Sequence, residues 1–378
     1  MKFSYCFILI SWMFGNGCVM AQAIKPSAKN ATLQTVNLYK NLHALKGKAV
    51  MFGHQDALAY GVNWRYEEGR SDIKDVTGDY PAVYGWDIGG IEMGNENNLD
   101  DVPFKKMKAY IKQVYERGGV NTISWHPRSP IGAEKGSWDT TKGTVTGILP
   151  GGVNHNLYKD WLDKAATFFK SLKGKDGELI PILFRPYHEH TGNWFWWCKN
   201  VATDAEYKTL WRFTVYYLQD VKKVNNLLWV YSTAGDVKTE TEFLERYPGD
   251  DVVDMLGFDA YQYDDPATSN SFLTNVDNLL GIVSKIAKDK NKLHALTETG
   301  YEAIPYPTWW TGVLWKAMEK HDASYVLVWR NHGWKKWENK MHYYAPYKGQ
   351  ASEKDFLVFY NLDKAFFQKA VTEQSLYK

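Results

Sequence analysis

Two glutamates lie at the ends of apolar, strand-like runs, and their type and placement suit acid–base and nucleophilic chemistry. Glu189 ends the run Arg185–Glu189, which reads Arg-Pro-Tyr-His-Glu, and Glu298 lies within Leu296–Gly300, which reads Leu-Thr-Glu-Thr-Gly. Retaining glycosidases use two carboxyl groups about 5–5.5 Å apart, one as proton donor and one as nucleophile. The two runs therefore predict the hydrolysis of a glycosidic bond.

The surroundings of the two glutamates predict different roles for them. A proton donor must be neutral at the working pH, and Trp194–Trp197 follow Glu189 closely enough to supply an apolar aromatic wall that favours this state. A nucleophile must be ionised, which a neighbouring arginine favours. Arg185 lies deeper on the same predicted strand as Glu189 and is expected to reach Glu298. Our hypothesis is that Glu189 is the acid and Glu298 the nucleophile.

A repeating pattern of strands and helices must position these residues. Eight short runs, most of them rich in apolar and in β-branched or aromatic residues, are typical of strands buried on both faces, and stretches with 3.6-residue periodicity separate them. Eight such units predict a closed (β/α)8 TIM barrel, a single α/β domain over residues 24–378. A doubly wound sheet is the alternative, but no glycine-rich phosphate turn follows the first run. The predicted strands are Ala49–Gln55, Ala82–Ile88, Val120–Pro127, Ile180–Glu189, Leu227–Ser232, Met255–Tyr261, His294–Thr299 and Tyr325–Asn331.

Polar residues follow nearly every predicted strand, at the end where the loops of a barrel converge on its axis. Any one of them could be a polar group that simply meets solvent, but eight such ends facing one mouth predict a site. Because the fourth and seventh strands are expected to lie across the barrel from each other, their glutamates can flank a bound sugar. The strand-end residues are His54, Gln55, Trp86, Asp87, Trp125, His126, Arg185 to His190, Ser232, Asp259, Tyr261, Glu298, Trp329 and Arg330.

Other chemistries find weaker support in the sequence. The triplet His188-Glu189-His190 suggests a metal site, but on a strand Glu189 would point to the face opposite the two histidines, and no spaced Cys/His cluster completes the site. Neither a nucleophile elbow nor a phosphate-binding loop is present. We therefore predict catalysis without a metal ion or a cofactor.

Net charge and aromatic content indicate what kind of molecule the protein binds. The net charge is only +2 with both signs interspersed, which argues against a nucleic-acid footprint or a basic membrane patch. Aromatic residues make up 16% of the chain, and their flat faces stack well on sugar rings. The runs Trp194–Trp197 and Trp309-Trp310, and the pair Trp334/Trp337, are more concentrated than packing alone requires, which favours sugar contacts.

The first 23 residues have the pattern of a signal peptide. Lys2 supplies a positive start, 7–14 is an apolar run too short to span a bilayer, and Ala21-Gln22-Ala23 is a small-residue cleavage signature. We expect an exported protein, periplasmic or extracellular. Cys18 raises a lipoprotein anchor as the alternative, although Gly15-Asn16 stands where such signals usually carry an aliphatic residue.

The motifs occur in an order that resembles glycoside hydrolase family 26, the β-mannanases of a large clan of retaining barrels. The resemblance runs from Phe52–Gln55 through Arg185–Glu189 and Trp194 to Trp329–Asn331, across the whole mature chain. The clan at large has Asn before the acid/base glutamate, whereas family 26 has His, which is His188 here. The signal is therefore specific at the level of the family.

The resemblance implies a role for each candidate residue. Glu189 would be the general acid/base and Glu298 the nucleophile, which Tyr261 would orient through a hydrogen bond. His188 would lie near the substrate 2-OH and Trp329 would floor the cleavage subsite. The remaining candidates would line that subsite and its leaving-group side; they are His126 and Trp194, with Arg185 beneath.

The implied substrate is a β-1,4-linked mannan, galactomannan or glucomannan, and the chain is expected to act as a monomer. Alternatives on the same scaffold are a β-1,3-xylanase and a lichenase. A barrel that binds glycans without cleaving them would lack one of the glutamates, and both are present. Three long loops, 89–101, 128–156 and 331–354, are expected to wall one end of the cleft and so to favour short products such as mannobiose.

Overall fold

A closed ring of parallel strands forms the centre of the protein. The computed structural model describes Met1, residues 24–336 and residues 338–378, so positions 2–23 of the expected signal peptide and Trp337 lie outside the described residues. Within the described part, β1 pairs with both β4 and β10, which closes eight strands into the predicted (β/α)8 barrel. The barrel strands are β1 (Val50–Gln55), β4 (Val83–Asp87), β5 (Val120–Trp125), β6 (Ile182–Pro186), β7 (Leu227–Ala234), β8 (Met255–Gln262), β9 (Leu293–Tyr301) and β10 (Tyr325–Val328).

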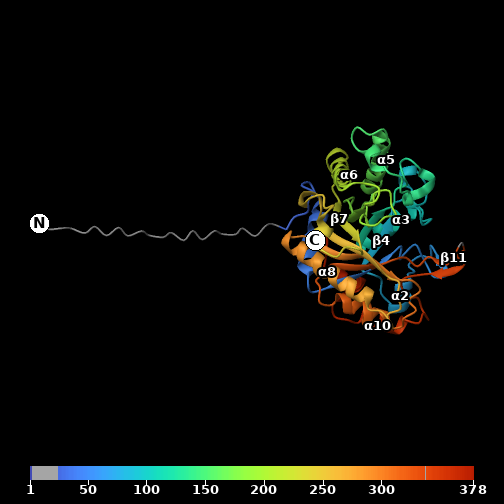
Figure 1. Ribbon diagram of the computed structural model, residues 1–378. Coiled ribbons are helices and arrows are strands. Elements are labelled where there is room, and N and C mark those ends of the chain that lie inside the picture. Colours follow the sequence, from blue (N-terminus) through green and yellow to red (C-terminus); the bar gives the residue numbers. More distant parts are fainter. Residues whose placement is uncertain (2–23, 337) are drawn as a thin grey trace.

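Helices surround the strands (Figure 1). Their apolar faces recur every three to four residues, as in α8, where Val276, Leu279, Leu280 and Val283 are buried against the barrel. The start of α6 is fixed by a capping box, in which Thr203 and Glu206 bond each other's backbone N–H groups. The helices are α1 (Leu33–Leu45), α2 (Asp72–Thr77), α3 (Phe104–Glu116), α4 (Thr144–Ile148), α5 (His155–Ser171), α6 (Asp204–Tyr216), α7 (Glu240–Leu244), α8 (Ser271–Asp289), α9 (Lys316–Met318), α10 (Glu353–Tyr360) and α11 (Gln368–Glu373).

The loops contain two short hairpins, one additional strand and several short helical segments. Two hairpins, β2 (Tyr60–Gly61) with β3 (Trp64–Arg65) and β11 (Gly333–Lys335) with β12 (Lys340–His342), follow β1 and β10 respectively. The strand β13 (Ala365–Phe366) pairs with the start of β1. Short 3₁₀-helical segments are η1 (Ile91–Met93), η2 (Ala133–Trp138) and η4 (Asp250–Val252), and short π-helical segments are η3 (Tyr217–Val221) and η5 (Trp310–Trp315).

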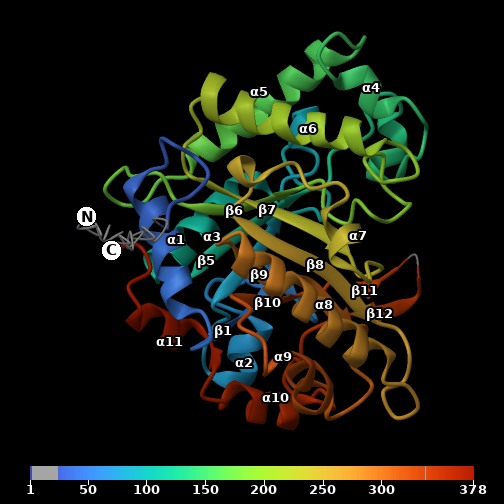
Figure 2. The same ribbon diagram turned by 60° about the vertical axis from the view of Figure 1, so that its left-hand side comes forward.

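The barrel interior changes from apolar to polar along each strand. Inward-facing residues near the strand starts form one apolar cluster with Leu38, Tyr39 and Leu42 of α1, which closes that end of the barrel (Figure 2). Because side chains alternate along a strand, the next inward positions follow at intervals of two. On β6 the apolar Leu183 is thus followed by Arg185, and on β7 Val230 is followed by Ser232. The barrel interior is therefore a packed apolar core at the strand starts and a polar surface at the carboxyl ends of the strands.

Most of the clustered tryptophans belong to the core, which corrects the expectation that their concentration indicates sugar contacts. Trp309 and Trp310 are fully buried, and Trp310 packs edge-on against Phe356. Trp196 and Trp197 are also fully buried. Large rings fill the space between the wide barrel wall and its helices, so packing does explain these runs. Trp194 and Trp334, which are 36% and 51% exposed, remain available at the surface.

None of the helices in the described residues combines the length and the apolar character that crossing a membrane requires.

Candidate active site

An arginine that pairs with two carboxylates lies at the polar end of the barrel interior. Arg185 on β6 donates to Asp259 on β8 and to Glu298 on β9, with 2.5 Å between Arg185 Nη2 and Glu298 Oε2. Asp259 also accepts hydrogen bonds from the hydroxyls of Ser232 and Thr297, at 3.0 and 2.7 Å. All of these residues are at most 5% exposed, so the guanidinium and its carboxylates hold one another in a water-poor environment. The expected contact of Arg185 with Glu298 is confirmed.

A bulge in β9 turns Glu298 toward the barrel axis. Leu293, Ala295 and Thr297 face inward on β9, so regular alternation would point Glu298 outward with Leu296. The pairing with β8 shifts by one residue between Phe258↔Leu296 and Asp259↔Glu298, and the pairing with β10 shifts at the same place. One extra residue in β9 therefore brings Thr297 and Glu298 to the same polar interior, as bulges beside active sites do.

Glu298 is held at both of its oxygens. Oε2 pairs with Arg185, and Oε1 accepts a hydrogen bond of 2.5 Å from the hydroxyl of Tyr261, which extends from the inward face of β8. The expected hydrogen bond from Tyr261 is confirmed. Two opposing donors fix the plane of the carboxylate, so its orientation does not depend on a bound ligand.

Glu189 is presented by a turn rather than by a strand, which corrects the predicted strand end. β6 stops at Pro186, and both Tyr187 and Glu189 adopt the left-handed conformation, with φ of 50° and 53°. Residues other than glycine rarely take this conformation, and such strained residues cluster at functional sites. The turn is anchored because the Glu189 N–H donates to the carbonyl of Ser232 on β7 at 3.0 Å.

The environment of Glu189 favours its neutral form. Burial, followed by the negative charges of Asp259 and Glu298, raises the pKa of Glu189 well above its usual value, against the opposing effects of Arg185 and Trp194. The indole of Trp194 donates to Glu189 Oε2 at 2.8 Å. These surroundings therefore favour the protonated form of the Glu189 carboxyl, while Glu298 forms an ion pair with Arg185. Their strands β6 and β9 are three positions apart around the ring rather than directly opposed.

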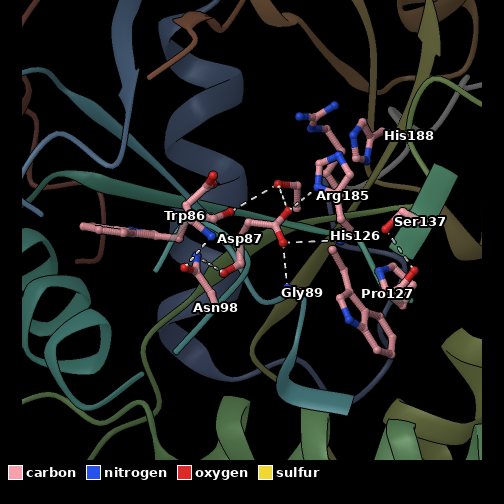
Figure 3. Close-up of polar contacts among 12 residues, drawn as sticks. Trp86, Asp87, Gly89, Asn98, His126, Pro127, Ser137, Arg185 and His188 are labelled. Atoms are coloured by element: carbon pink, nitrogen blue, oxygen red, sulfur yellow. Dashed lines mark hydrogen bonds and ion pairs between the residues drawn. The ribbon is translucent and has the colours of Figure 1, made fainter. Parts of the chain in front are cut away.

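The pKa values of two histidines near Arg185, His126 and His188, are shifted in opposite directions (Figure 3). Burial lowers the pKa of His126, but Asp87, 2.7 Å from its Nδ1, and then Glu298 outweigh this effect and raise it. Burial and the charges of Arg185 and His126 lower the pKa of His188 well below its usual value. The two rings meet edge to face with centroids 4.5 Å apart. The protonated form is thus favoured at His126 and the neutral form at the adjoining His188.

Trp329 lies beyond the end of β10 and is half-buried. Its backbone N–H donates to Thr299 on β9 at 2.9 Å, next to Glu298. The neighbouring Arg330 lies over the Trp329 ring, 5.8 Å from its centroid, and pairs with Asp100 at 3.1 Å. Trp329 is therefore linked directly to the end of β9 that carries Glu298, and through Arg330 to the loop after β4.

The triplet His188-Glu189-His190 does not form a joint ligand set. His190 turns away and packs between Tyr207 and Tyr231, with ring centroids 4.4 and 4.7 Å away. His188, Asp259 and Glu298 do offer ligand atoms within 4.8 Å of one another. Because the guanidinium of Arg185 contacts both carboxylates, it already provides the positive charge that a metal ion would bring to this cluster.

Comparison with known proteins places this site in a family. The family model for glycosyl hydrolase family 26 matches residues 27–346. The chain belongs to glycosyl hydrolase family 26. The resemblance inferred from its motifs is thereby confirmed.

Relatives and solved structures that resemble this chain cover from 73% to 93% of it. A mannan endo-1,4-β-mannosidase of Bifidobacterium adolescentis is 33% identical over 93% of this chain, which spans only 36% of that protein. One from Bacillus subtilis is 29% identical over 73% of each chain. A β-mannanase structure from Bacteroides ovatus is 45% identical with a TM-score of 0.87, covering 92% of this chain and 98% of that one. A modular endo-β-1,4-mannanase structure from Cellulomonas fimi is 33% identical with a TM-score of 0.81, covering 92% and 78%.

Asp87 and Asp259 were among the strand-end residues expected at the mouth of the barrel, but the sequence assigned them no role. Asp259 accepts from Arg185, Ser232 and Thr297, and burial raises its pKa to about 7 against the lowering effect of Arg185. Asp87 is fully buried and accepts from Ser124, the Gly89 N–H and His126. The signal that could have identified both residues is their position, because each is an acidic residue at the end of a barrel strand and faces the barrel interior.

Replacing Asp87 by asparagine should weaken catalysis most at high pH. The substitution removes the charge that raises the pKa of His126, so the imidazolium is lost at a lower pH than in the wild type. Losing a charge-assisted hydrogen bond predicts a fall in kcat/KM of about 10- to 100-fold at neutral pH and a smaller fall in acid. Ser124→Ala, which removes one hydrogen bond to Asp87 but no charge, is the control. An unchanged pH profile in Asp87→Asn would contradict the role given to Asp87.

Proposed function

We propose that the protein is a retaining β-1,4-mannanase in which Glu298 is the nucleophile and Glu189 the acid/base. The observation that carries the proposal is the contrast between the two carboxyl groups. Glu298 is ion-paired with Arg185 and hydrogen-bonded by Tyr261, whereas the pKa of Glu189 is raised well above its usual value. Double displacement needs one carboxyl that donates a proton and a second, fixed carboxyl that attacks, and these two environments suit those roles.

In the first step, the Glu298 carboxylate attacks the anomeric carbon while the Glu189 carboxyl protonates the departing glycosidic oxygen. The bond to the leaving chain breaks, and a glycosyl–Glu298 ester forms. In the second step, the ionised Glu189 takes a proton from water, whose oxygen displaces Glu298 from the anomeric carbon. Two displacements at one carbon retain its β configuration.

The surrounding side chains would hold the sugar and the reacting groups. Trp329 offers a ring as the floor of the cleavage subsite, and Trp194 offers one on the leaving-group side while its indole donates to Glu189. Against the effect of burial, Asp87 raises the pKa of His126, whereas burial lowers the pKa of His188, and we assign this pair to the sugar hydroxyls around the 2-OH. Arg185 and Tyr261 act on the substrate through Glu298.

The substrate assignment rests on the relatives, several of which are named as mannan endo-1,4-β-mannosidases. Wild-type protein is expected to release reducing sugar from linear β-1,4-mannan and galactomannan, and much less from β-1,3-xylan and lichenan. Because all three activities would use the same glutamates, the glycan panel tests the substrate alone. Preferential cleavage of β-1,3-xylan or lichenan would keep the mechanism and overturn the substrate.

We also propose that the Trp329 side of the cleft is closed and favours short products such as mannobiose. The loops after β1, β4 and β10 are joined there, because Asp100 pairs with Arg330 and its carbonyl accepts from Arg65. Asn331 adds a hydrogen bond to Asp72 at 2.8 Å. An even ladder of oligosaccharides from linear mannan would contradict this closure.

Export is part of the same proposal, because polymeric mannan cannot reach an enzyme inside the cell. We propose removal of residues 1–23 as a signal peptide and action as a monomer in the periplasm or outside the cell. Mass spectrometry of the mature N-terminus distinguishes cleavage after Ala23 from a lipidated Cys18.

A further inference from the structure

Arg246 is a buried arginine that the two-glutamate chemistry does not use. It follows α7 and is 0% exposed. Asp204, whose carboxylate lies 3.3 Å from Nε, is itself partly exposed, so it balances the charge of the guanidinium only in part. Burying a charged group costs free energy unless the group is paired or hydrogen-bonded. The other contacts of the guanidinium therefore indicate why an arginine stands at this position.

The guanidinium of Arg246 donates to four backbone carbonyls of one segment, residues 190–203. A planar, forked guanidinium can satisfy several acceptors at once, which a single ammonium cannot. Because the four carbonyls lie at the start, the middle and the end of the segment, Arg246 joins these parts at one point. The donor–acceptor distances are 2.6 Å to His190, 3.2 Å to Trp197, 3.0 Å to Ala202 and 3.4 Å to Thr203.

The segment held in this way presents the acid/base glutamate. His190, whose carbonyl Arg246 binds, is the residue after Glu189, so its peptide group cannot shift without moving Glu189. The same segment carries Trp194, whose indole donates to Glu189 Oε2 at 2.8 Å. Within it, the Cys198 thiol donates to the carbonyl of Glu189 at 3.4 Å. Arg246 is therefore linked through the backbone to both the acid/base carboxyl and its hydrogen-bond partner.

Arg246 also contacts a residue that supports the left-handed turn carrying Glu189. Its guanidinium lies over the ring of Tyr207 on α6, 4.3 Å from the centroid, and the Tyr207 hydroxyl donates to the carbonyl of Tyr187 at 3.2 Å. Tyr187 and Glu189 both adopt the left-handed conformation, which costs free energy and persists only where the surrounding structure imposes it. The contacts of Arg246 and Tyr207 supply part of this constraint.

The nucleophile is held by a separate set of contacts. Glu298 lies on β9, and its two oxygens are bound by Arg185 of β6 and Tyr261 of β8, all of them in the barrel wall. Loss of Arg246 is therefore expected to displace Glu189 while leaving Glu298 in place. We propose that Arg246 is a positioning residue for the acid/base, which keeps the Glu189 carboxyl directed at the glycosidic oxygen; this rests on the proposed function.

The test uses two substrates that differ in their need for a proton. Unbranched mannohexaose needs one from Glu189 on its leaving oxygen, whereas the leaving group of 2,4-dinitrophenyl β-mannobioside departs without it. Arg246→Met removes the donors but keeps a long, adaptable side chain in the space beside Tyr207. Arg212→Met is the matched control, because Arg212 on α6 also donates to a backbone carbonyl, that of Pro248 at 2.9 Å, outside residues 190–203.

Arg246→Met is expected to lower kcat/KM for mannohexaose about 10- to 100-fold, the loss that a small misplacement of a catalytic group produces. For 2,4-dinitrophenyl β-mannobioside, kcat/KM should stay near the wild-type value, because it reports only the steps up to the covalent ester. Arg212→Met should match the wild type on both substrates. Arg246→Lys keeps the charge but offers one ammonium to four carbonyls, so it should show the same selective loss in smaller measure, and it replaces Arg246→Met if that variant does not fold.

The ratio of the two activities separates positioning from stability. An unfolded fraction lowers both values of kcat/KM equally and leaves their ratio unchanged. Equal losses on the two substrates, or wild-type kinetics in the Arg246 variants, would therefore overturn the proposal. A selective loss of the same size in Arg212→Met would also overturn it. Wild-type protein that cleaves neither substrate would instead contradict the mannanase assignment, so the two failures are distinguishable.

Discussion

Glu298→Ala is expected to lower kcat on mannohexaose by a factor on the order of 10⁴ or more, because no other group can form the covalent intermediate. Glu298 is only 5% exposed, and Arg185 and Tyr261 hold its two oxygens in place. Added azide should restore turnover by entering the space left by the carboxylate. It would attack the face that Glu298 attacks, so the product should be the α-mannosyl azide, identifiable by NMR.

Glu302→Ala is a suitable control for Glu298→Ala. Glu302 follows β9 closely but pairs with Lys340 at 2.9 Å, away from Arg185. This variant should retain nearly wild-type kcat. Substantial mannohexaose cleavage by Glu298→Ala, or a β-mannosyl azide as its product, would remove Glu298 from the role of nucleophile.

Glu189→Ala is expected to have an effect that depends on the leaving group. On mannohexaose, whose leaving group needs a proton, kcat/KM should fall by about 10²–10⁴-fold. With 2,4-dinitrophenyl β-mannobioside, which leaves without help, formation of the intermediate should proceed and its hydrolysis should become limiting. Azide should then accelerate turnover and give the β-mannosyl azide. Equal losses on the two substrates would contradict the assignment of Glu189.

The pH profile of the wild type provides a second measure of Glu189. A general acid works only while protonated, so kcat/KM should fall as pH rises through the pKa of Glu189, which burial, Asp259 and Glu298 raise well above its usual value. The alkaline limb should therefore lie at higher pH than an ordinary glutamate would allow. For Glu189→Ala acting on 2,4-dinitrophenyl β-mannobioside, this limb should disappear from the first step.

The charges of Arg185, Asp259 and Glu298 together influence the protonation of Glu189. Arg185 is flanked by Asp259 and Glu298, so the buried cluster keeps one excess negative charge when both carboxyls are ionised. That excess charge is part of what keeps the proton on Glu189. Asp259 thereby contributes to both halves of the mechanism, since it positions the arginine that holds Glu298 and disfavours the ionisation of Glu189.

The barrel and its polar mouth were predictable from local pattern. Strands buried on both faces produce continuous apolar runs, and each predicted run overlaps a strand of the closed ring. The inward positions change from apolar to polar along a strand, as from Leu183 to Arg185, so the ends that carry chemistry could be recognised. The motif around Glu189 and Glu298, read with Trp329, was specific enough to indicate the family. These features depend on residue type and spacing along one segment.

Tertiary structure decided how those residues face one another. Regular alternation would have pointed Glu298 away from the axis, and only the bulge, set by pairing with β8 and β10, turns it inward. Likewise Glu189 stands on a left-handed turn anchored to Ser232 on the next strand, not at a strand end. Which tryptophans pack and which reach the surface also depended on neighbours far along the chain, as for Trp310 against Phe356. Bulges, strained turns and burial arise from contacts between distant segments, and the local order of residues does not encode them.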